Sequence, residues 1–142
     1  MLLKTILNSI EKFKSFVYGK SYIEGKGENQ QIIIEINPRK NSKGLCPACQ
    51  KPSPGYDRQP LRRFQHVPLW NIPVYFEYAP RRIYCKRHGI HVELLPFASG
   101  KEQLTRSYKL FLSTWAKRLS WKEVATVFST SWETVLRSVK YV

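Results

Sequence analysis

Aspartate is nearly absent from this 142-residue chain: Asp57 is the only one among its ten acidic residues. Any site that needs two aspartates therefore cannot be built from this chain alone. The acidic residues are also outnumbered by 24 lysines and arginines, which give a formal net charge of +14. Positive charges in such excess repel one another, and the positive electrostatic potential that they produce favours a polyanionic partner.

Cysteine and long apolar runs are also scarce. Three cysteines cannot all pair with one another, and Cys46 and Cys49 are too close in sequence for an ordinary structural disulfide, so metal binding in a reducing compartment is the better interpretation. No apolar run approaches the roughly 18 residues that span a bilayer, and Lys4 and Asn8 interrupt the N-terminal segment, which has no cleavage signal behind it. We expect a cytoplasmic protein without a membrane partner.

The first hundred residues combine one helical pattern with several strand patterns. Apolar residues recur at three- and four-residue steps from Leu3 to Val17, which predicts an amphipathic helix that docks on the rest of the chain. Glycines then break this pattern. Strands are expected at 31–36, 63–69 and 72–84, the last with a break at Ala79-Pro80. Alternating aromatic residues in that last strand favour core packing over a base-stacking platform.

After Pro96 the hydrophobic period changes from two to about 3.6, which predicts three short helices. Thr105 is positioned to cap the first of them, and Ser120 with Glu123 forms a capping-box pattern for the second. Thr130 with Glu133 repeats that pattern for the third helix. The expected fold class is thus α+β: a small zinc-ribbon-like domain with an N-terminal helix (1–98), followed by a three-helix helix-turn-helix bundle (99–142).

The strongest local signal is a Cys-x2-Cys pair and a Cys-x2-His pair with 35 residues between them. Two such knuckles supply four ligands to one ion, and because all four positions are filled by protein, the site would be structural. We therefore predict one structural Zn²⁺ held by Cys46, Cys49, Cys85 and His88. His91 is the second choice for the fourth ligand.

Two other histidine patterns carry less weight. His66 is expected to be an ordinary histidine of a strand. His91 and Glu93 form an H-x-E sequence, as in zinc deaminases, but those enzymes place it before the cysteine pair, whereas here it follows. The order of the motifs therefore argues against a deaminase.

The C-terminal helices are expected to recognise double-stranded DNA. In a helix-turn-helix the start and outer face of the last helix enter the major groove. The residues at these positions are Ser131, Trp132, Glu133, Thr134, Arg137 and Lys140. Arg137 suits a guanine or phosphate contact, Lys140 a phosphate, and Arg81 and Arg82 further phosphates beside the metal site.

Several motifs together resemble the N-terminal part of bacterial insertion-sequence transposases of the IS-L-three family. In chain order they are Cys46–Cys49, Gly55–Arg58, Arg81–Arg82, His88–Glu93, Leu95–Pro96, Gly100–Lys101, Leu104–Thr105 and Leu119–Ala125. The resemblance implies a zinc-ribbon-like domain and a helix-turn-helix that recognise the terminal inverted repeats of the element, ahead of an RNase-H-like catalytic domain.

That catalytic domain would need a triad with two aspartates, which this chain cannot supply, and the last helical pattern runs to residue 142 without a stop signal. We therefore expect the non-enzymatic, DNA-binding portion of a transposase, nucleoid-associated in a bacterial cytoplasm and homodimeric in its full-length form. The alternatives are a free-standing zinc-containing helix-turn-helix transcriptional regulator and a zinc ribbon that binds RNA or protein.

Overall fold

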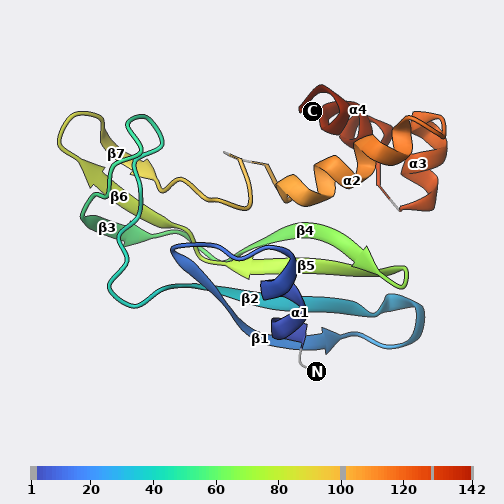
Figure 1. Ribbon diagram of the computed structural model, residues 1–142, viewed down its shortest axis with the longest axis horizontal. Helices are drawn as coiled ribbons and strands as arrows, with labels where there is room; N and C mark the ends of the chain where they lie inside the picture. The colour runs from blue at the N-terminus through green and yellow to red at the C-terminus, as the bar shows by residue number, and fades with distance from the viewer. Residues whose placement is uncertain (1–2, 100–101, 129, 142) are drawn as a thin grey trace.

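A four-stranded sheet forms the centre of the computed structural model, which describes residues 3–99, 102–128 and 130–141 (Figure 1). Its strands lie in the order β1-β2-β5-β4, and β2 and β5 are parallel while the other neighbours are antiparallel. The bounds are β1 Phe16–Glu24, β2 Gln31–Pro38, β4 Arg62–Leu69 and β5 Ile72–Tyr78.

A second, three-stranded antiparallel sheet lies at one end of the molecule (Figure 1). It consists of β3 (Gly55–Arg58), β6 (Arg81–Cys85) and β7 (Gly89–Val92), in the order β3-β6-β7. Only Ala79 and Pro80 separate β5 from β6, so one continuous run of chain passes from the first sheet into the second. The strands expected at 31–36, 63–69 and 72–84, with the break at Ala79-Pro80, are confirmed.

The main core covers one face of the four-stranded sheet. Alternate residues of β2 and β5 point into it because successive side chains of a strand face opposite sides. These are Ile32, Ile34, Ile36, Val74, Phe76 and Tyr78, all buried. Helix α1 (Leu3–Ile10) contributes Leu7 to this core, and each fully buried large apolar side chain stabilises the fold by about 1.5–3 kcal/mol. The aromatic residues of β5 therefore serve packing, as expected.

Phe97 anchors the segment that connects the second sheet to the C-terminal helices. Its ring centroid lies 5.3–6.2 Å from five other aromatic rings, most of them in edge-on geometry. These belong to Phe13, Phe16, Phe64, Phe76 and Tyr78. The connecting segment is thus part of the core.

Three helices follow: α2 (Arg106–Ala116), α3 (Trp121–Val127) and α4 (Trp132–Tyr141). Thr105 caps α2 by accepting a hydrogen bond from the Tyr108 N–H, and Ser120 and Glu123 form the expected capping box at α3. At α4 the cap lies one residue later than expected, because Ser131 Oγ accepts from the Thr134 N–H.

The fold class expected from the sequence is wrong. The described residues form a mixed α/β structure with four α-helices and two sheets, not a small zinc ribbon with an N-terminal helix followed by a three-helix helix-turn-helix bundle. The C-terminal helices also pack on the sheet: their core of Leu104, Tyr108 and Leu112 includes Val67 of β4. The backbone of Gln65 in β4 bonds to residues 103 and 105. Local helix signals could not show that a sheet surface would share this core.

The N-terminal helix is also shorter than expected. It ends at Ile10, and β1 begins at Phe16, within the segment for which the sequence predicts a helix and then a break. Gly19 permits this strand, since a Cβ there would lie 2.6 Å from Asn37 Nδ2 on β2. A division at 98/99 stays a prediction, and its expected boundary glycine, Gly100, lies outside the described residues.

Candidate metal centre

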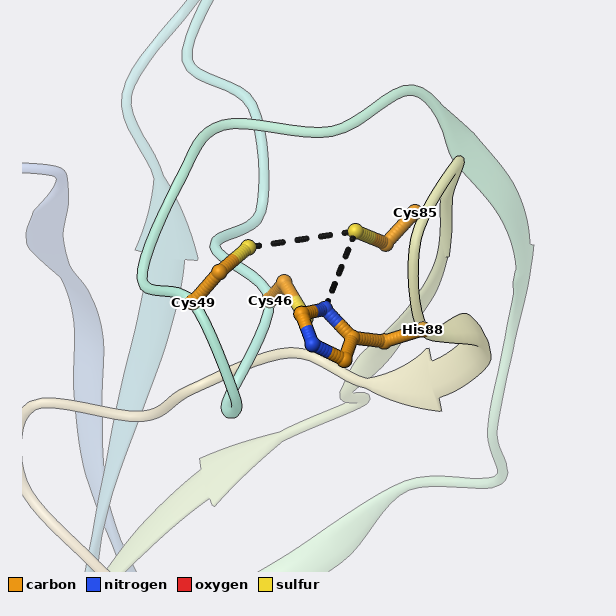
Figure 2. Close-up of side chains that lie close together, drawn as sticks. All are labelled: Cys46, Cys49, Cys85 and His88. Carbon is orange, nitrogen blue, oxygen red and sulfur yellow. Dashed lines mark hydrogen bonds between the residues drawn. The ribbon is translucent and has the colours of Figure 1, made fainter.

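Two tight turns, one in the connection from β2 to β3 and one between β6 and β7, bring the four predicted metal ligands together (Figure 2). The first turn carries Cys46 and Cys49 and is closed by a 2.7 Å bond from the Gln50 N–H to the Cys46 carbonyl. The second joins β6 to β7: Cys85 ends β6, and His88 precedes Gly89, whose φ of +79° is the left-handed conformation that glycine tolerates best.

The ligand atoms of Cys46, Cys49, Cys85 and His88 all lie within 4.8 Å of one another. The Cys49 and Cys85 sulfurs are 3.8 Å apart, and His88 Nδ1 lies 3.5 Å from Cys85 Sγ and 3.7 Å from Cys46 Sγ. Figure 2 shows the four side chains converging from the two turns. These residues are therefore close enough to hold a metal ion.

The environment of the sulfurs differs from one cysteine to the next. The Arg87 N–H, followed by the side chain of His88, lowers the pKa of Cys85 to about 6. At Cys49 the Lys51 N–H lowers the pKa, but burial and the neighbouring thiols of Cys46 and Cys85 outweigh it and raise the pKa overall. Cys85 thus ionises more readily than Cys49, and thiolates are the form that binds metal.

A small hydrophobic core lies against the metal site. Ile83 is fully buried and packs with Cys46 and Cys85. Gly44 lies where a Cβ would meet Ile83 Cγ2 at 2.7 Å and Glu93 Cβ at 3.0 Å, so the first turn approaches β6 more closely than any other residue would allow. Gly44 is not among the residues predicted for this site, although its position two residues before Cys46 is a usable signal.

His91 is not part of the ligand cluster. It is exposed, and its Nε2 lies 2.6 Å from the His88 carbonyl oxygen. Glu93 also lies outside the cluster, since it binds Arg81 and Tyr78. Among the described residues, the side chains of the H-x-E sequence therefore contribute no ligand atom to the cluster, unlike in a deaminase.

Arg81 is held inside the fold by Glu93. Its guanidinium lies 3.0 Å from Glu93 Oε1, and the same carboxylate accepts the Tyr78 hydroxyl at 2.6 Å and the Arg81 N–H at 2.7 Å. The carboxylate is 1% exposed, and a further Arg81 nitrogen donates to the Ser42 carbonyl. These contacts give Arg81 a structural role. The sequence alone did not indicate it, because Glu93 was considered only as the acidic residue of the H-x-E pattern.

Arg82 differs from its neighbour. It pairs with Asp57, and its guanidinium lies over the ring of Tyr56, but both members of the ion pair are about 40% exposed. Hydrogen bonding to Arg82 lowers the pKa of Asp57. The only aspartate of the chain thus serves a surface ion pair, and the prediction that Arg82 contacts phosphate stays a prediction.

The residues predicted to contact DNA from the last helix do not share one environment. Ser131, Trp132, Glu133, Arg137 and Lys140 are exposed. Thr134 is 9% exposed, and its hydroxyl lies 2.9 Å from that of Ser131. Arg137 contacts the Thr134 hydroxyl at 3.3 Å. Thr134 therefore lies against the protein, whereas the other five residues of the set are exposed to solvent.

His66 lies on β4, as expected, between the sheet and α2. Its ring stacks on Phe76, and Nδ1 lies 2.8 Å from the hydroxyl of Thr105, the residue that caps α2. Burial lowers the pKa of His66 from 6.5 to about 4. The folded protein therefore binds this proton less readily than the unfolded chain does.

This shift predicts an acid-sensitive fold. The contribution of His66 is fully present above pH 6.5, falls as the pH drops towards 4 because the unfolded chain takes up the proton first, and levels off below that. Relative to His66→Gln, wild type should lose about 3 kcal/mol of unfolding free energy between pH 7 and pH 4. Urea denaturation of both proteins at several pH values measures this loss. If the unfolding free energy changes with pH by the same amount in wild type and in His66→Gln, the prediction is wrong.

Comparison with known proteins adds no relative: no family model, no characterised protein and no solved structure matches the chain significantly. In the described part of the chain, no helix is long and apolar enough to cross a bilayer.

Proposed function

We propose that the four-ligand cluster binds one structural zinc ion. With metal–ligand distances of about 2.3 Å for sulfur and 2.0–2.1 Å for nitrogen, a tetrahedral zinc site has edges of about 3.8 Å between sulfurs and about 3.6 Å between sulfur and nitrogen. The distances of 3.8, 3.7 and 3.5 Å agree with these edges. Three thiolates and an imidazole are ligands that suit zinc, and they leave no position for a reacting water.

We further propose that the chain is a DNA-binding module. The observation that carries this proposal is how the charges are distributed. Among the described residues, five of the ten acids are held in ion pairs by only four basic residues. Most of the 24 lysines and arginines thus have no acidic partner there, and a duplex with one negative charge per about 1.7 Å of its axis is a matching polyanion.

The particular role we propose is the recognition of the terminal inverted repeats of an insertion sequence, as the non-catalytic part of an IS-L-three-type transposase. Support comes from the order of motifs in the sequence and from a metal cluster whose ligands are all protein side chains. In this role Arg137, Lys140 and Arg82 are the residues best placed to contact DNA, since Arg81 is occupied by Glu93. Zinc thiolates and a DNA partner both fit a bacterial cytoplasm.

Duplex binding should be strongly salt-dependent. Removing one side chain that binds a phosphate should reduce the slope of log K against log salt by about 0.9. Fluorescence anisotropy with a labelled duplex at several salt concentrations measures this slope for wild type, Arg82→Ala and Lys140→Ala. A duplex carrying the inverted repeat of the encoding element, compared with a scrambled one, tests the narrower role. Absence of duplex binding at low salt would contradict the whole proposal.

A further inference from the structure

A large cavity lies between the four-stranded sheet and the first turns of α4. Its volume is about 800 Å³, within the range of about 300–1,000 Å³ usual for ligand sites. We call it the α4 groove and define it by six lining residues: Arg63, Gln65, Tyr75, Gln103, Thr134 and Arg137. They come from β4, β5, the connection to α2, and α4.

The groove collects hydrogen-bonding groups that the fold does not use. The side chains of Gln65, Gln103 and Tyr75 make no hydrogen bond to another residue in the described ranges, and Arg137 has only its 3.3 Å contact with Thr134 there. Two amides, a phenol ring and a guanidinium offer donors, acceptors and a flat apolar face. This combination suits planar bases joined by phosphates.

The α4 side of the groove favours an anion. The α4 N-terminus, where Thr130 and Thr134 line the cavity, carries the positive end of the helix dipole, and Arg137 adds a full positive charge. The acidic wall residue Glu102 is neutralised by Lys109 Nζ at 3.1 Å. Arg63 is bound by two carboxylates, those of Glu24 and Glu77, so it adds no net positive charge, and Arg137 is the residue that would carry the phosphate contact.

A peptide is a poorer occupant. Peptides commonly bind beside a sheet by adding a strand to its free edge. Here residues 103–105 already bond to Gln65 of the edge strand β4, so that position is taken. A double helix is too wide to enter a cavity of this size, whereas a short stretch of a single strand is not.

We propose that the α4 groove binds one or two nucleotides of single-stranded nucleic acid, such as an unpaired end of the DNA that the rest of the surface holds as a duplex. This inference rests on the proposed DNA-binding function and deepens it. Arg137 contacts a phosphate, Tyr75 stacks on a base, and the amides of Gln65 and Gln103 bond to base edges. Arg118 is exposed, does not line the groove and is not among the residues proposed to contact DNA, so it provides a matched control.

The test uses the metal-loaded chain and a fluorescent oligothymidylate about ten residues long. Arg137→Gln should weaken its binding about tenfold, and Gln103→Ala about threefold. Arg118→Gln, which removes the same type of side chain and the same charge outside the groove, should weaken it less than about twofold. Thermal melts of the variants, whose replaced side chains are exposed, provide the control for folding.

The outcomes separate the two proposals. If wild type binds duplex but not the oligothymidylate, the groove inference is wrong and the DNA-binding proposal stands. If it binds neither, the proposed function is wrong as well. Equal losses for Arg137→Gln and Arg118→Gln would show that only overall charge matters, and displacement of the oligothymidylate by polyglutamate at similar concentration would indicate an acidic protein partner. Either result overturns the inference.

Discussion

Replacing Cys85 by serine, or removing the metal with a chelator, is expected to unfold the second sheet and the loops around it, within residues 41–58 and 81–95. The physical reason is the size of its core: Cys46, Ile83 and Cys85 are the buried residues of that cluster, so apolar burial alone supports the sheet weakly. A structural zinc site contributes on the order of 10 kcal/mol in small domains. The four-stranded sheet has its own core, which contains none of the ligands, and should keep more of its structure.

Elemental analysis of protein purified under reducing conditions should give one zinc per chain. Hydrogen exchange should then show that β6 and β7 amides lose protection after chelation, while β2 and β5 amides lose less. His88→Ala and His91→Ala form a matched pair, because only His88 belongs to the ligand cluster. A preparation without metal, or equal metal loss in the two histidine variants, would contradict the proposed site.

Replacing Arg81 by alanine is expected to destabilise the fold by about 3–5 kcal/mol, because it leaves the carboxylate of Glu93 buried without its cation. Replacing Arg82 should change stability little, since its ion pair with Asp57 is exposed to solvent. Chemical denaturation of the two single variants measures the difference. Arg82→Ala should nevertheless weaken duplex binding, and more than Arg81→Ala does, because Arg82 is the one proposed to contact a phosphate.

Unchanged stability of Arg81→Ala, together with weaker binding to every duplex, would show that the Glu93 contact does not fix this side chain. The double variant Arg81→Met/Glu93→Leu provides a further control. It removes both charges from the buried site. If the unpaired carboxylate of Glu93 causes the loss of stability in Arg81→Ala, the double variant should recover a large part of that loss.

The sequence by itself determined the features that depend on neighbours along the chain. The four ligands could be named because each pair lies within one tight turn. A spacing of two residues is what allows both side chains of such a turn to bind the same metal ion. The capping box of Ser120 and Glu123 was visible for the same reason, since both hydrogen bonds join residues three positions apart. The strands β2 and β5 could be placed from their β-branched and aromatic runs.

Only the tertiary structure decided which surfaces meet. Strand β1 was missed because its second half is exposed on both faces and a bulge interrupts its alternation, so its pairing with β2 defines it. The helices after Thr105 matched their local signals, yet their packing on β4 overturned the expected fold class. Likewise Arg81 and Glu93, twelve residues apart, meet only because β6 and the segment after β7 lie side by side. Such contacts depend on the shape of the buried surfaces, which short-range patterns in a sequence do not contain.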